Sequence, residues 1–111
     1  MMLLSLALLA VQPEPAPVRE ALDEYRACLR SVIVVARSNA RAFGEAFDHA
    51  ADFCQPDWRS AFGTLARHGR ERGLDESEAH DAARDRMEAL RAESRAALAA
   101  DFGAGEQENG N

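Results

Sequence analysis

The 111-residue sequence has no lysine, few aromatic residues and no long hydrophobic run beyond its first eleven positions. Aromatic residues make up only 6% of the chain and much of its 47% hydrophobic fraction is alanine, so we expect a thin hydrophobic core. All 13 basic residues are arginine, and the formal net charge is -6 at pH 7. This balance argues against a nucleic-acid-binding protein, because contacts with phosphate need a basic surface.

The sequence also lacks the patterns that mark common active sites. No Ser/His/Asp set, glycine-rich phosphate loop or paired-carboxylate signature can be placed in it. His49, His68 and His80 are scattered and have no C-x-x-C or H-x-x-x-H spacing, so they do not indicate a four-ligand zinc site. We therefore expect a protein that is not an enzyme and that carries no cofactor.

The first eleven residues, MMLLSLALLAV, are almost wholly apolar. They are too few for a membrane span, which needs about 20 residues, but they fit the apolar part of a secretory signal, although no basic residue precedes them. The sequence therefore predicts export to the periplasm or the medium, with no stable membrane span. The other interpretation, a hydrophobic segment packed into the core, stays open at this stage.

The rest of the chain has the periodicity of amphipathic helices, and we predict an all-α fold. Residues 12–17 form a proline-rich linker and residues 18–102 a helical domain. The tail, which has one alanine and otherwise polar residues and glycine, is expected to be disordered over 103–111. The domain is expected to be a small bundle of three helices, at about 17–37, 41–71 and 76–102.

Local signals place the ends of these helices. Pro17 suits a helix start, and Gly73 can adopt the left-handed conformation that ends one. Asp75 followed by Glu78 forms a capping-box pattern for the third helix. The apolar stripe of the second helix crosses Pro56 without a change of phase, so that helix is expected to be kinked or broken near there.

The two cysteines, Cys28 and Cys54, are predicted to form a disulfide. Both lie on apolar helix faces, and their mean position, 41, falls inside an interruption of the helical pattern that contains Ser38, Asn39 and Gly44. A hairpin that reverses there would bring the cysteines level, within the roughly 7 Å between Cα atoms that a disulfide needs. One unbroken helix would instead separate them by about 39 Å, and free buried thiols are a further possibility. Trp58, one turn beyond Cys54, is expected to lie near Met87 and Leu90.

Two clusters of polar residues were considered as binding sites. Asp48, His49 and Asp52 share one helical turn, but three ligands on an exposed helix would bind a metal weakly, and a solvated face is the preferred interpretation. The basic cluster at 67–72 is interpreted as cations that complement a helix C-terminus, in preference to an anion site. Acids and arginines between 88 and 95 are expected to form ordinary surface pairs.

The apolar leader, the YRAC stretch, the second cysteine and the PDW that follows it resemble small exported helical two-cysteine proteins of proteobacteria with no assigned activity. The resemblance covers residues 25 to about 100 and implies no catalytic residue. Two functions remain in view. The first is an exported, non-enzymatic helical protein that contacts an unknown protein partner and is itself a monomer or weak homo-oligomer. The alternative is a periplasmic metal- or stress-responsive binding protein.

Overall fold

The computed structural model describes residues 14–39 and 41–109, with side chains described to residue 103. This part of the chain is helical and contains no strand, which confirms the all-α class. The helices, listed in chain order, are α2 (Ala16–Ser38), α3 (Phe43–Phe53), α4 (Gln55–Glu71) and α5 (Glu76–Asn109). The predicted export segment, 1–11, lies outside the described residues.

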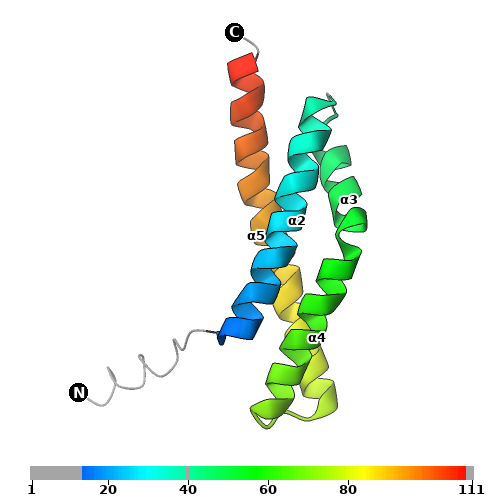
Figure 1. Ribbon diagram of the computed structural model, residues 1–111, viewed down its shortest axis with the longest axis vertical. Coiled ribbons are helices and arrows are strands. Elements are labelled where there is room, and N and C mark those ends of the chain that lie inside the picture. The colour runs from blue at the N-terminus through cyan, green and yellow to red at the C-terminus, as the bar shows by residue number, and fades with distance from the viewer. Residues whose placement is uncertain (1–13, 40, 110–111) are drawn as a thin grey trace, which may run out of the picture.

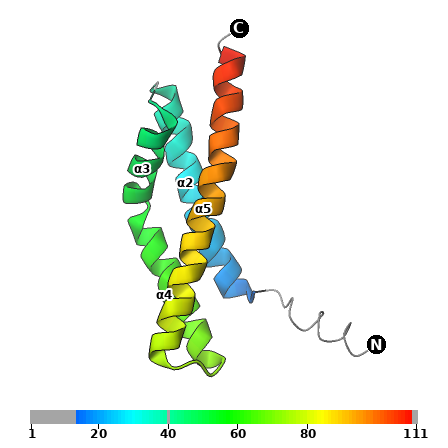
Figure 2. The ribbon, with the colours of Figure 1, turned by 180° about the vertical axis from the view of Figure 1, so that it is seen from behind.

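The helices form three columns, because α3 and α4 follow one another along a single descending column (Figure 1). That column runs antiparallel to α2, and α5 then runs back beside α4 and in the same direction as α2. Figure 2 shows from behind how α5 passes along the bundle and continues toward the C-terminus. Among the described elements, α5 packs most extensively on α4 and more sparsely on α2 and α3.

The prediction of three helices is corrected to four, because the second predicted helix is broken at Cys54. Pro56 has no N–H to give and its ring would clash with the carbonyl of Asp52 in a straight helix. The backbone departs from the helical conformation at Cys54, which has φ -90° and ψ 14°. Cys54 caps both the end of α3 and the start of α4. The amide of Trp58 still donates to the Cys54 carbonyl at 3.1 Å, so the two helices remain joined end to end.

The turn between α4 and α5 is built from the residues that the sequence indicated. Gly73 has φ 97°, and its amide donates to the Arg70 carbonyl while the Leu74 amide donates to the Gly69 carbonyl. Asp75 Oδ1 accepts the Glu78 amide at 2.8 Å, and Glu78 Oε1 accepts the Asp75 amide at 3.1 Å. The capping box is therefore confirmed.

The two ends of the helical region differ from the predicted boundaries. The end of the linker predicted at 12–17 overlaps α2, which begins at Ala16, where Pro17 supplies a preorganised first turn. The α5 helix continues to Asn109, whereas the sequence predicts a disordered tail from residue 103. Alanine, glutamate and glutamine in the tail favour helix, and an existing helix is extended more easily than a new one is nucleated.

The core is a single cluster in which alanine is frequent and no charged side chain is buried among the described residues. Its largest fully buried side chains include Tyr25, Phe47 and Met87. Trp58 is only partly buried, and its ring meets the Tyr25 ring edge-on with centroids 5.6 Å apart. Trp58 packs against the core cluster, to which Met87 and Leu90 also belong. Its ring partner, Tyr25, was not predicted.

Candidate functional site

The structure joins Cys28 on α2 to Cys54 at the junction of α3 and α4. The two Cα atoms lie 5.9 Å apart and the sulfurs are bonded. This placement confirms the hairpin, because one continuous helix would hold the cysteines far apart. The chain reverses between Asn39 and Ala42, around the position midway between the cysteines. Cys54 is completely buried, whereas Cys28 is half-buried.

A carboxylate lies beside this disulfide. Asp57 is in the first turn of α4, three residues after Cys54, and is half-buried. One oxygen of Asp57 and the two sulfurs all lie within 4.8 Å of one another. Within the described residues, this is the only group of three metal-ligating side chains that the fold brings so close together. Asp57 was not predicted as a ligand, although its spacing from Cys54 places both residues on one side of a helical turn.

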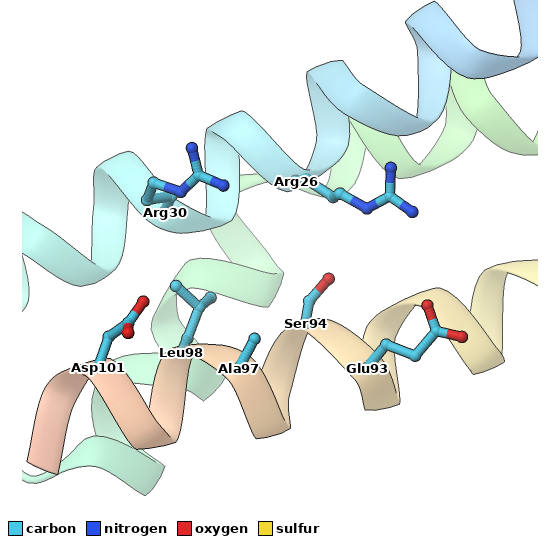
Figure 3. Close-up of a pocket in the computed structure, with 7 residues that line it drawn as sticks. All are labelled: Arg26, Arg30, Glu93, Ser94, Ala97, Leu98 and Asp101. Carbon is cyan, nitrogen blue, oxygen red and sulfur yellow. The ribbon is translucent and has the colours of Figure 1, made fainter.

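The second feature is a groove of about 210 Å³ between α2 and α5. Arg26 and Arg30 extend from α2 along one wall, and Glu93 and Asp101 extend from α5 along the other (Figure 3). Ser94, Ala97 and Leu98 lie between the acids on α5 and form its floor. The groove therefore presents positive charge on one side and negative charge on the other.

The arginines of the groove differ in their partners. Arg26 Nη1 donates to Asp23 Oδ1 at 2.8 Å, one turn back along α2, in a pair that is largely exposed. Arg30 is exposed, and its guanidinium lies along α2 in Figure 3, on the side away from α5. The groove was not foreseen, because only the three-dimensional packing brings α2 beside the part of α5 from Glu93 to Asp101.

Next to the groove, two arginines of α5 lie over phenylalanine rings of α3. The Arg95 guanidinium carbon is 5.6 Å from the Phe43 ring centroid and 5.1 Å from that of Phe47, and Arg91 is 5.8 Å from Phe47. Phe102 closes this cluster edge-on against Phe43. The expected surface pairs of Arg91 and Arg95 with acids are not among the ion pairs of the described residues, so these arginines pack as cation–π partners instead.

The fold shifts the pKa values of Tyr25 and Arg86, as well as that of Asp75 in the capping box. Burial raises the pKa of Tyr25 above its ordinary value, and the positive charge of Arg91 acts in the opposite direction. Arg86 on α5 donates to both carboxylate oxygens of Glu14, at 3.2 and 3.0 Å, and this bidentate bond is the main reason that the pKa of Arg86 is raised. The pair fixes the chain ahead of α2 to α5 across 72 positions of sequence.

The other polar clusters considered from sequence are not assembled into sites. Asp48, His49 and Asp52 are all exposed on α3, as expected for a solvated helix face. The basic residues at 67–72 lie at the end of α4, where cations complement the helix dipole. The three histidines are far apart in the sequence. The His80 ring meets the Phe62 ring edge-on, with the ring centroids 4.8 Å apart.

No family model, curated protein or solved structure matches this chain. No helix in the described part of the chain combines the length and the hydropathy that crossing a membrane requires.

Proposed function

We propose that this chain is an exported, non-enzymatic helical protein, periplasmic in a Gram-negative cell, that acts through contact with another protein. The disulfide supports export, because disulfides persist in oxidising compartments and are rare in the cytosol. The apolar segment at 1–11 supports it from the sequence side. Neither feature requires a catalytic group.

The observation that carries the contact function is the charge arrangement of the α2–α5 groove. Arg26 and Arg30 lie on one wall and Glu93 and Asp101 on the other, with a floor of small and apolar side chains between them. Val34, one helical turn beyond Arg30 along α2, is an apolar side chain that is 59% exposed. A cleft with opposite charges on its walls orients a charged partner and rejects one whose charges are reversed.

The occupant that we propose is a helix of a different exported protein. It would present acids to the α2 wall and arginines to the α5 wall, with small apolar residues between them to meet Ala97 and Leu98. A helix fits because the two walls are themselves helices that run side by side, and a third helix can lie in the channel between them.

The test is affinity capture from the exporting cell with the native protein and with the Arg26→Glu/Arg30→Glu variant. The proposal expects a captured exported protein that binds the purified native chain directly and binds the variant at least about tenfold more weakly, a loss of about 1.4 kcal/mol. The matched control is Arg67→Glu/Arg70→Glu, which makes the same charge change on the exposed face of α4. Circular dichroism verifies that both variants remain helical.

Three results would contradict this proposal. Equal binding by the native chain and the groove variant would show that the groove is not the contact surface. Loss of binding in the α4 control alone would move the contact to the basic cluster. Sedimentation that shows a concentration-dependent dimer, abolished by the groove variant, would mean that a second copy of this chain fills the groove.

Export is tested separately by the intact mass of the protein isolated from its native host. A mass that lacks the first residues, with the disulfide formed, is expected. A species that retains Met1 would show that the apolar segment is kept and would contradict the proposed signal.

A further inference from the structure

The corner between α2 and the start of α4 holds three potential ligands, of which two are occupied by the disulfide bond. Cys54 is the residue that caps α4, and Asp57 stands one turn into that helix. Cys28 approaches from α2, and one ligand atom of each residue lies within 4.8 Å of the others. The proposed contact surface does not include this group, although the oxidised disulfide supports the proposed export.

We propose that reduction of the Cys28–Cys54 disulfide turns this corner into a binding site for a thiophilic divalent cation, with zinc as the best match. The two thiolates and the Asp57 carboxylate would supply three ligands and water the fourth. In the oxidised protein the sulfurs are bonded to each other and the site is closed.

The chemistry balances with a dithiol as the reductant. The Cys28–Cys54 disulfide takes two electrons and two protons from the dithiol, which leaves as its own disulfide. Two thiols result, and the S–S bond is broken. When one divalent cation binds, each thiol gives up its proton to solvent and forms one metal–sulfur bond, so one ion enters and two protons leave.

The geometry suits a tetrahedral ion. Zinc binds thiolate at about 2.3 Å and carboxylate at about 2.0–2.2 Å, so its ligand atoms are about 3.6–3.8 Å apart in a tetrahedron. All three atoms already lie within 4.8 Å of one another, and the Cα atoms of the two cysteines are 5.9 Å apart. Rotation about the Cα–Cβ bonds can open the sulfurs to this spacing without a movement of the helices.

The corner is closed on the Cys54 side and open on the other. Cys54 is completely buried at the junction of α3 and α4. Cys28 and Asp57 are only half-buried, so an ion and its water ligand can enter from solvent on that side. Two soft sulfurs with one carboxylate select zinc or cadmium over magnesium or calcium, which prefer oxygen ligands.

The test uses the full chain, reduced with a dithiol that is then removed anaerobically by gel filtration. Cobalt(II) is the spectroscopic probe, and zinc is the competitor. We expect one cobalt per chain with a thiolate-to-metal charge-transfer band and visible bands of tetrahedral type, both abolished by one equivalent of zinc. The oxidised protein should give no such band.

Variants identify the third ligand. Asp57→Asn should weaken zinc binding by about tenfold or more, since loss of even an outer-shell partner costs about 10–100-fold. Asp48→Asn is the matched control, an acid on exposed α3, and should bind as the native chain does. Equal affinity of the Asp57→Asn and native chains would overturn the assignment, and would point to two-sulfur binding as for copper(I).

The reduced chain could also lose structure, and the test remains decisive in that case. Circular dichroism is recorded before and after zinc addition. Recovery of helix with one equivalent of zinc supports the site, because metal binding then drives folding. No recovery, or no saturable cobalt binding in a reduced chain that keeps its helix content, would overturn the proposal.

Discussion

Two glycines of α4 provide a matched test of how closely this helix packs on α5. A Cβ added at Gly63 would have nothing within 4 Å, whereas one added at Gly69 would lie 3.1 Å from the Ala79 Cβ and 3.3 Å from its Cα. Gly63 is exposed and Gly69 is buried. The same substitution, glycine to alanine, therefore has the same intrinsic effect on the helix but a different steric cost.

The Gly63→Ala variant should be more stable than the native protein by about 0.5–1 kcal/mol, because alanine loses less conformational entropy in a helix than glycine does. At Gly69 the gain is opposed by overpacking, which costs about 1–3 kcal/mol when the neighbour cannot move away. Ala79 cannot, because its Cα and Cβ are fixed to the first turns of α5. We expect Gly69→Ala to destabilise the protein by about 1 kcal/mol, so the two variants should differ by about 2 kcal/mol.

The assay is urea unfolding of the oxidised protein, followed by circular dichroism, with the midpoint compared at equal slope. A double variant, Gly69→Ala/Ala79→Gly, removes the nearest contact and should recover part of the loss, with a coupling energy of about 0.5 kcal/mol or more. If Gly69→Ala stabilised the protein as much as Gly63→Ala does, the close approach of α4 and α5 described above would be refuted.

Three further predictions concern the disulfide and two ionisable residues. Replacement of Cys28 and Cys54 by serine should lower the free energy of unfolding, measured by urea unfolding, by about 3.5 kcal/mol. This is the entropic contribution expected for a cross-link between residues 26 positions apart. A loss under about 1 kcal/mol would contradict this prediction. Because the pKa of Tyr25 is raised in the folded protein, the stability that the neutral phenol contributes is present below the unfolded pKa, near 10, and falls as the pH rises toward the folded pKa. In the Tyr25→Phe variant, the free energy of unfolding should fall less steeply with pH above about 10. The hydrogen bond from the amide of Glu78 lowers the pKa of Asp75, so the stability gained from its carboxylate is present above the unfolded pKa and is lost as the pH falls through the folded pKa. Asp75→Asn should therefore reduce the loss of stability at acid pH. An unchanged loss of stability at acid pH would contradict the capping role.

Features that depend on neighbours in sequence were predictable. Pro17, Gly73 and the Asp75–Glu78 box act within one helical turn, so the residues alone indicate where α2 begins and where α4 gives way to α5. The hairpin of α2 with α3 and α4 was predictable for a different reason. Two cysteines and one weak point in the helical pattern gave independent estimates of the same reversal, and the structure places it there.

The break at Cys54 was only half predictable. A kinked helix and two helices joined end to end keep the same hydrophobic phase across Pro56, so periodicity does not distinguish them. What distinguishes two helices from one kinked helix is the backbone conformation of Cys54, whose ψ of 14° ends α3. That conformation depends on how Cys28 and the core hold the junction, which is a property of the folded state.

Apart from the disulfide and its hairpin, contacts between distant segments were not predictable. Glu14 and Arg86 are 72 positions apart, and neither has a signal that singles it out from the other charged residues. Arg91 and Arg95 were expected to pair with acids one turn away, because the helical spacing allows it. In the fold, phenylalanine rings of α3 lie within reach of both, and an arginine packed flat on a ring also covers apolar surface that a thin core leaves accessible.

The bundle is held differently in its two halves, and the disulfide lies where these halves meet. Below Cys54, α4 and α5 approach so closely that a Cβ added at Gly69 would lie 3.1 Å from the Ala79 Cβ. Above it, α3 is held by Phe43 and Phe47 under the arginines of α5. Because helix continuity is interrupted at Cys54, the bond to Cys28 is what ties the end of α3 and the start of α4 to α2 at a common level. The Cys28–Cys54 bond therefore connects both α3 and α4 to α2.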